Sequence, residues 1–178
     1  VKGYRIAGLN VPAKLVSGDY FDFFEIDAQH LGVVIADVSG KGVPASLITA
    51  MCRSVVRANS IDTLSPSRVL SKANLQLFPD IREDMFISLA YVVLEADNPE
   101  IQMARAGHDP PLHYQASEQT VTALQSPGIA IGIDAGNVFD KAIQDQNLKL
   151  QPGDILLLHT DGVNEATNQH GEEFGLDR

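Results

Sequence analysis

The order of the elements that this sequence predicts constrains its fold more than any other feature. Strand-like segments come first, a pair of helices follows in direct succession, and a long series of strands completes the chain. Parallel α/β folds alternate strands with helices, so this order favours an antiparallel α+β fold in which the helical pair covers one face of a sheet. The predicted strands are residues 4–9, 23–27, 31–37, 85–94, 101–106, 112–114, 121–124, 147–150 and 155–159.

The helical pair has the clearest pattern. Residues 43–59 carry an apolar face at helical spacing, and Pro44 stands in the first turn, where its missing N–H is not needed. Ser65 and Pro66 supply a cap and a first-turn residue for the second helix, whose apolar positions fall within residues 69–77. Two amphipathic helices are therefore expected side by side.

Composition bounds the kind of protein. With 178 residues, of which 44% are hydrophobic, the chain can bury the core of one domain. The net charge of −10 argues against a nucleic-acid partner, because neutralising phosphates needs clustered Lys and Arg. The single cysteine, Cys52, excludes an internal disulfide and fits a reducing compartment. No apolar run approaches the roughly 18 residues of a membrane span. We therefore expect a cytoplasmic protein.

Acidic turns mark the candidate site. The apolar run 31–36 ends on Asp37, a Ser-Gly-Lys-Gly turn follows, and a helix begins beside it. Such a turn places a carboxylate next to backbone N–H groups and so suits a divalent cation and a phosphate together. A second apolar run leads into Asp161, and Asp19 forms a third acidic turn. Each of these aspartates alone is more often a simple turn residue. Because burying an unpartnered carboxylate is costly, the strands that end on Asp37 and Asp161 favour one metal centre. Oxygen ligands without a His/Cys cluster favour Mg²⁺ or Mn²⁺ over Zn²⁺.

Other polar residues give weaker signals. Asp22 fits a turn or the periphery of the site, and Lys41 belongs to a glycine turn that lacks the spacing of a phosphate-binding P-loop. Ser39 has no partners for nucleophilic chemistry that the sequence reveals, and Cys52 lies on an apolar helix face. His108 follows a glycine in a proline-rich turn, where a structural hydrogen bond is the more common role than catalysis.

A series of motifs then carries a family resemblance. The set resembles the RsbU/SpoIIE-type bacterial branch of the metal-dependent, type 2C-like (PPM) Ser/Thr protein phosphatases, and it spans nearly the whole chain in that family's order. The motifs are residues 18–24, 36–45, Asn74 before 85–89, 106–112, 128–132, 151–158, and 160–166 with 171–175.

The resemblance implies a four-layer α/β/β/α sandwich over residues 1–178 with two Mn²⁺ or Mg²⁺ ions in a cleft at one end. It implies that Asp37 bridges the metals, that the carbonyl of Val38 and the carboxylate of Asp161 are further ligands, and that Asp19 belongs to the same cluster. Asp19, Asp37 and Asp161 are thus the expected catalytic set. A metal-bridging hydroxide would attack the phosphoryl group in line. The implied substrate is phosphoserine or phosphothreonine on a STAS-domain anti-anti-sigma-factor in a partner-switching pathway.

Departures from the family pattern leave a second function open. Relatives continue beyond the segment at 174–175 through a helix to a strand with another metal aspartate, so we expect a domain that lacks this C-terminal helix and strand. We also expect it to be part of a longer signalling protein, in which an N-terminal helical linker pairs two copies. Lys41 and Asp109 stand where many relatives have His and Asn. The alternative function is a phosphatase-like interaction module that binds a STAS partner with little or no turnover.

Overall fold

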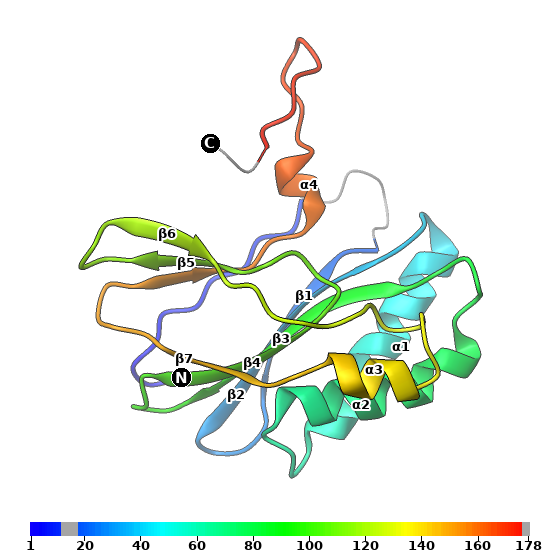
Figure 1. The fold of residues 1–178 in the computed structure, drawn as a ribbon, viewed down its shortest axis with the longest axis horizontal. Helices are drawn as coiled ribbons and strands as arrows, with labels where there is room; N and C mark the ends of the chain where they lie inside the picture. Colours follow the sequence, from blue (N-terminus) through cyan, green and yellow to red (C-terminus); the bar gives the residue numbers. More distant parts are fainter. Residues whose placement is uncertain (12–17, 176–178) are drawn as a thin grey trace.

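The computed structural model describes residues 1–11 and 18–175 and contains two antiparallel sheets. Figure 1 shows the sheets facing each other, with α1 and α2 packed on the larger one. The larger sheet has the order β1-β2-β3-β4-β7 and the smaller one the order β6-β5-β8. The strands are β1 (Tyr20–Glu25), β2 (His30–Val38), β3 (Ile87–Glu95), β4 (Glu100–Ala106), β5 (Leu112–Gln115), β6 (Thr120–Ala123), β7 (Gln146–Lys149) and β8 (Ile155–Leu157). The helices are α1 (Val43–Ser60), α2 (Pro66–Leu77), α3 (Asn137–Ala142) and α4 (Asp161–Asn164), with a 3₁₀ turn at Phe78–Asp80.

The helical pair covers the outer face of the larger sheet. Val56 of α1 and Leu70 of α2 are buried in one core together with Val34 of β2. The side chain of Ser65 accepts a hydrogen bond from the Arg68 amide at 3.3 Å, which is the predicted N-cap of α2. Both predicted helices are therefore confirmed, and their apolar faces bury against a sheet as expected.

A second apolar core fills the space between the two sheets. Val33, Val92 and Met103 of the larger sheet are buried there, and Leu156 of β8 packs against them. Successive strand residues point to opposite faces of a sheet, so Val33 and the other odd-numbered residues of β2 face the smaller sheet. Asp37 shares this parity and lies near the end of β2. The pleat thus directs its carboxylate to the inter-sheet side.

The outer face of the smaller sheet is covered by no helix within the described part of the chain. Val121, Ile155 and Leu157 are each at least 50% exposed on it. The two antiparallel sheets and their helical layer confirm the expected α+β architecture, whereas the fourth, helical layer is not among residues 1–11 and 18–175. Across those same residues, no helix is long and apolar enough to cross a bilayer.

Residues 4–9 form no strand, which corrects the sequence-based prediction. Tyr4 donates its hydroxyl to the carbonyl of Asn98, and Gly8 lies so close to the ring of Phe21 that a Cβ on it would be 2.4 Å from a ring carbon. Leu9 is 85% exposed, so the apolar residues of this segment do not form a buried strand face. Side-chain contacts hold the segment in place of a β-ladder.

Candidate metal centre

Asp37 and Asp19 meet where β1 and β2 lie side by side. The antiparallel register pairs Tyr20 with Ala36, and it therefore brings the residue before Tyr20 next to the residue after Ala36. These residues are Asp19 and Asp37. The sequence predicted each of them separately, and the strand register is what brings them together.

Gly18 allows the backbone to approach Asp37 closely. A Cβ at this position would lie 2.4 Å from the carbonyl oxygen of Val38 and 3.3 Å from Oδ1 of Asp37. The first contact is too short for any side chain, so the position requires glycine. The same measurement shows that the Val38 carbonyl and the Asp37 carboxylate face one small volume beside Gly18.

The neighbouring carboxylates make it harder for Asp37 to ionise. The pKa of Asp37 is raised from 3.8 to about 7, first by burial and then by the negative charges of Asp19 and Asp161. A hydrogen bond with Asp19 and the charge of Glu165 act in the same direction. Glu165 belongs to the motif at residues 160–166, but the sequence did not identify it as a site residue.

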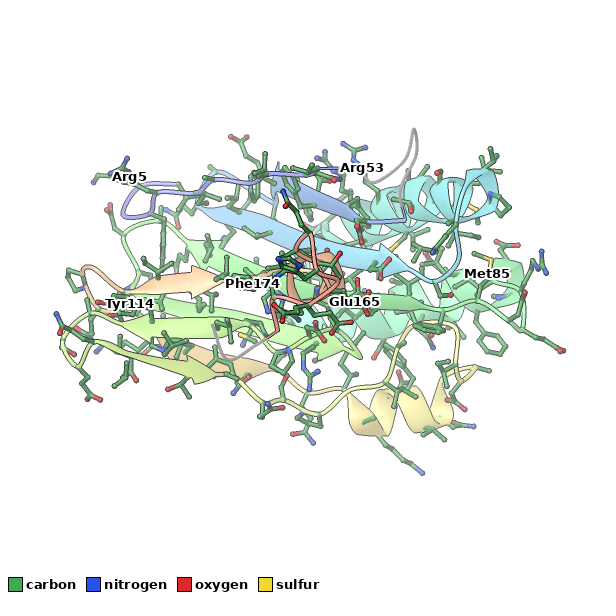
Figure 2. All side chains as sticks on the ribbon, turned by 90° about the horizontal axis from the view of Figure 1, so that it is seen from above. Arg5, Arg53, Met85, Tyr114, Glu165 and Phe174 are labelled. Carbon is green, nitrogen blue, oxygen red and sulfur yellow. The ribbon has the colours of Figure 1, made fainter. Side chains whose placement is uncertain are left out.

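Asp161 approaches the pair from the other sheet. It opens the short helix α4, which follows β8, and its carbonyl accepts the amide of Glu165 at 2.8 Å. Its charge acts on Asp37, but no group of three or more His, Cys, Asp or Glu side chains in the described ranges is close enough to hold a metal ion. Figure 1 shows α4 and the C-terminal segment rising above the sheets, and Figure 2 looks down on this segment, where Glu165 and Phe174 are labelled. Asp161 therefore acts on Asp37 through its charge, without completing a group of three close ligands among the described residues.

The donor set fits a hard divalent cation. Two carboxylates and a backbone carbonyl offer only oxygen, which is the chemistry of Mg²⁺ and Mn²⁺ sites. The raised pKa of Asp37 reflects repulsion that a cation would relieve. Asp19, Asp37 and Val38 are the residues that could hold such an ion, with Asp161 as a further carboxylate within electrostatic reach.

Asp22 lies outside this cluster. In the β1–β2 ladder Asp22 is the cross-strand partner of Val34, whose side chain faces α1, so the Asp22 side chain lies on the same face. Its carboxylate accepts two hydrogen bonds of 2.6 Å from Arg57 of α1. Arg53 is also 3.2 Å from the same carboxylate. Asp22 is therefore a structural partner of α1 on the opposite face of β1.

The other polar candidates have structural partners. Ser39 Oγ accepts the amide of Phe86 at 2.7 Å, so it fixes the turn after β2. Cys52 is fully buried, and burial raises the pKa of its thiol to about 12, which makes it unreactive. Lys41 is exposed in the glycine turn, whereas His108 is buried.

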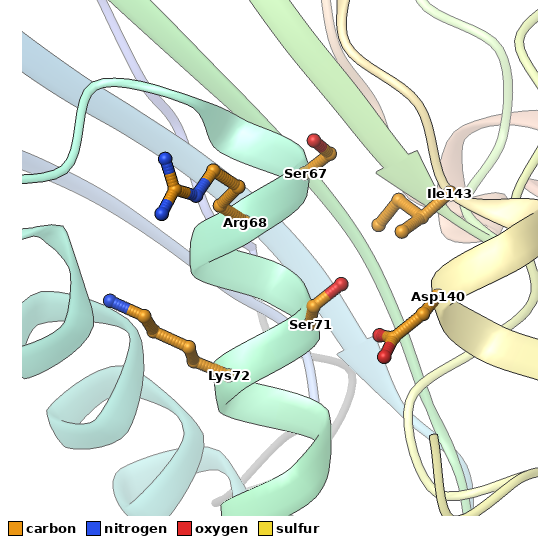
Figure 3. Close-up of a pocket in the computed structure, with 6 residues that line it drawn as sticks. All are labelled: Ser67, Arg68, Ser71, Lys72, Asp140 and Ile143. Atoms are coloured by element: carbon orange, nitrogen blue, oxygen red, sulfur yellow. The ribbon is translucent and has the colours of Figure 1, made fainter. Parts of the chain in front are cut away.

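A surface recess of about 320 Å³ lies elsewhere, between α2 and α3. Figure 3 shows Ser67 and Ser71 facing α3, while Arg68 and Lys72 extend away from Asp140. The N-terminus of α2 beside it is already occupied, because Asp145 accepts the Ser67 amide at 2.6 Å. The recess lies on the helical side of the larger sheet, so it is separate from the acidic cluster.

Comparison with known proteins supports the family resemblance that the sequence motifs indicate. A family model described as Stage II sporulation protein E (SpoIIE) matches residues 27–178. The phosphoserine phosphatase RsbU of Bacillus subtilis (strain 168) is 33% identical over 166 residues, which are 93% of this chain and 48% of that protein. The phosphoserine phosphatase RsbP of the same organism is 28% identical over 156 residues, covering 85% of this chain and 38% of that protein. The chain thus spans about half the length, or less, of these curated relatives.

The solved structures agree on the fold. The SiaA-PP2C domain of Pseudomonas aeruginosa superposes with a TM-score of 0.74 at 22% identity, over 92% of this chain and 64% of that chain. At this level of identity the similarity concerns the arrangement of sheets and helices.

Proposed function

Because the chain belongs to the SpoIIE family, we propose that it is the catalytic domain of a metal-dependent phosphoserine/phosphothreonine protein phosphatase. One observation carries the proposal. Asp19 and Asp37 meet beside Gly18, and the resulting repulsion helps to raise the pKa of Asp37 to about 7. Without a cation such an arrangement only destabilises the protein, so the cluster is best explained as a site for divalent metal.

The residues have distinct parts in this proposal. Asp37 and the Val38 carbonyl would hold two Mn²⁺ or Mg²⁺ ions together with Asp19, and Asp161 would join them from α4. Bound divalent cations supply Lewis acidity and activate water as the nucleophile for in-line attack on phosphorus. The protein's own contribution would be to fix carboxylates beside the end of β2 and at the start of α4, so that a phosphoryl group could bind between them. No serine or cysteine nucleophile is required, in agreement with the structural partners of Ser39 and Cys52.

The proposed substrate is a phosphorylated STAS-domain protein in the cytoplasm. RsbU and RsbP are both named phosphoserine phosphatases, which supports phosphoserine as the group that is hydrolysed. The STAS domain follows from the resemblance to the RsbU/SpoIIE branch. Dephosphorylation of such an anti-anti-sigma-factor would change its partner and release a sigma factor.

The test is hydrolysis of a phosphorylated STAS-domain protein and of p-nitrophenyl phosphate by the full-length protein. We expect activity that needs Mn²⁺ or Mg²⁺ and is abolished by EDTA. Asp37→Ala should lower it by more than about a hundredfold, since even the outer partners of metal ligands contribute about 10–100-fold. Asp22→Ala is the matched control on the other face of β1, where the carboxylate pairs with Arg57.

Two results would contradict the proposal. Turnover by Asp37→Ala within several-fold of wild type would show that this carboxylate is not a metal ligand. Wild-type protein that binds the phosphorylated STAS partner but hydrolyses neither substrate would instead support a non-catalytic interaction module.

A further inference from the structure

A partly buried hydrogen bond joins Ser88 to His108 on the strand next to Asp37. Ser88 Oγ and His108 Nδ1 are 2.8 Å apart. Ser88 is the cross-strand partner of Asp37 in the β2–β3 ladder, so both side chains project to the same face of the sheet. The histidine is only 3% exposed. The Ser88–His108 bond therefore starts on β3, the strand beside the one that carries Asp37.

The loop that carries His108 is fixed from several directions. Gly107 forms a bridge with Leu89 of β3, and a Cβ on it would lie 2.7 Å from the backbone nitrogen of Ala130. Arg105 donates hydrogen bonds to the carbonyl of His108 and to Ser126. The imidazole is thus held by backbone contacts that leave it little freedom.

The opposite side of His108 faces the segment that leads to Asp161. The backbone of His159 interacts with the His108 ring, although Nε2 of that ring has no partner within hydrogen-bonding distance among the described residues. Next along the chain from His108, Asp109 accepts a hydrogen bond from Asn164 of α4 at 3.2 Å. The residues at 108 and 109 therefore touch both ends of the connection that carries Asp161.

The ring is neutral in this environment. Burial lowers the pKa of His108 to about 4, and the charge of Asp109 opposes this only in part. A neutral ring offers one donor and one acceptor, and Nδ1 uses one of them with the Ser88 hydroxyl. The histidine therefore acts as a fixed hydrogen-bonding spacer.

We propose that Ser88 and His108 form a positioning pair that sets the separation of Asp37, near the end of β2, from Asp161 at the start of α4. The proposal rests on the proposed function, because it concerns the same metal centre. Neither residue touches the substrate or a cation; they hold the strand and the loop on which the ligands stand. Groups that hydrogen-bond a metal ligand directly contribute about 10–100-fold to metal affinity or activity, so a pair that acts one step further away should contribute near the lower end of this range.

The chain offers a matched control for a purely structural role. His113 is also buried, at 5% exposure, and its Nε2 lies 3.0 Å from Asp154. Asp154 precedes β8, whereas Asp161 follows it, so this second pair lies at the other end of the strand. Both histidines can be replaced by phenylalanine, which keeps a planar ring and removes the hydrogen bond.

The experiment measures Mn²⁺ affinity by calorimetry, kcat and KM with p-nitrophenyl phosphate, and melting temperature in EDTA, all on the full-length protein. Ser88→Ala and His108→Phe should weaken Mn²⁺ binding about tenfold or more and lower kcat more than they raise KM. Ser88→Thr keeps the hydroxyl and should restore most of the affinity. His113→Phe should lower the melting temperature without changing Mn²⁺ affinity.

Ser88→Ala keeps the test decisive if His108→Phe does not fold, because it removes only one oxygen from a partly exposed position. Unchanged Mn²⁺ affinity in folded Ser88→Ala, or an equal loss in His113→Phe, would overturn the proposal. Wild-type protein that binds Mn²⁺ but does not hydrolyse phosphoesters would refute the proposed function while the affinity comparison still decides the role of the pair. Wild-type protein that binds no Mn²⁺ would overturn both.

Discussion

Replacing Asp37 by asparagine should stabilise the metal-free protein while it removes metal binding. The pKa of Asp37 is raised from 3.8 to about 7, chiefly by burial and by the charges of Asp19 and Asp161. One pKa unit corresponds to about 1.4 kcal/mol, so the full shift would amount to about 4 kcal/mol. Because Asp37 is only partly buried, solvent screening reduces the expected gain in unfolding free energy to about 1–2 kcal/mol.

The pH dependence gives this prediction its sign. Between pH 4 and 7 the folded state keeps a proton on Asp37 that the unfolded chain releases, so the stability of the wild type falls as the pH rises through this range. The asparagine side chain of the Asp37→Asn variant has no proton to lose. The advantage of Asp37→Asn should therefore grow from pH 4 and reach its full size above pH 7.

Urea unfolding in EDTA at pH 5 and pH 8 measures this difference, and the same series in Mn²⁺ measures metal binding. The wild type should gain stability with Mn²⁺ as mass action requires, and Asp37→Asn should gain much less. Asp22→Asn is the control, because it removes a carboxylate paired with Arg57 and should destabilise at both pH values. An Asp37→Asn protein that is equally or less stable than wild type in EDTA at pH 8 would refute the account of crowded carboxylates.

Three further tests concern the close approach at Gly18 and the polar contacts around α3. Gly18→Ala should weaken Mn²⁺ binding and lower the melting temperature, because its Cβ would lie 2.4 Å from the Val38 carbonyl oxygen; unchanged Mn²⁺ calorimetry would argue against a close approach there. Asn74→Ala should cost about 2–3 kcal/mol in urea unfolding, since the buried amide accepts the Gly132 amide at 3.0 Å and donates to the Asp134 carbonyl at 2.9 Å. Backbone amides at the start of α3 hold the pKa of Asp134 below its usual range, so its contribution should be lost as the pH falls below about 3.9, and hydrogen exchange in α3 should then rise more than in α1.

The larger elements of this fold could be predicted because their signals are local. The apolar face of α1, the Ser65 cap and the β-branched run of β3 each occur within a short stretch of sequence. The prediction of a strand at residues 4–9 was wrong for the opposite reason. Its alternation is local, but a strand needs a partner edge, and the sequence does not show that Gly8 packs on the ring of Phe21 instead. The short helices α3 and α4 have too few residues to display a periodicity.

The candidate site was predictable in its residues and not in its geometry. Gly-Asp and Asp-Gly pairs and apolar strands that end on aspartate identified Asp19, Asp37 and Asp161, and the strand register joins the first two. The contribution of Glu165 and the bond between Ser88 and His108 depend on which strands are neighbours across the sandwich. Such contacts between distant segments have no signature in a single sequence.

The instability of the empty centre and its affinity for cations have one physical origin. Bringing Asp19 next to Asp37 requires a glycine at position 18, which gives up side-chain packing, and it confines like charges in a partly buried place. Both the glycine and the confined charges lower the stability of the metal-free protein. A divalent cation reverses the electrostatic part, because the same proximity that makes the carboxylates repel lets them share one ion. Substitutions that relieve the repulsion should therefore stabilise the apo protein in proportion to the metal affinity that they remove.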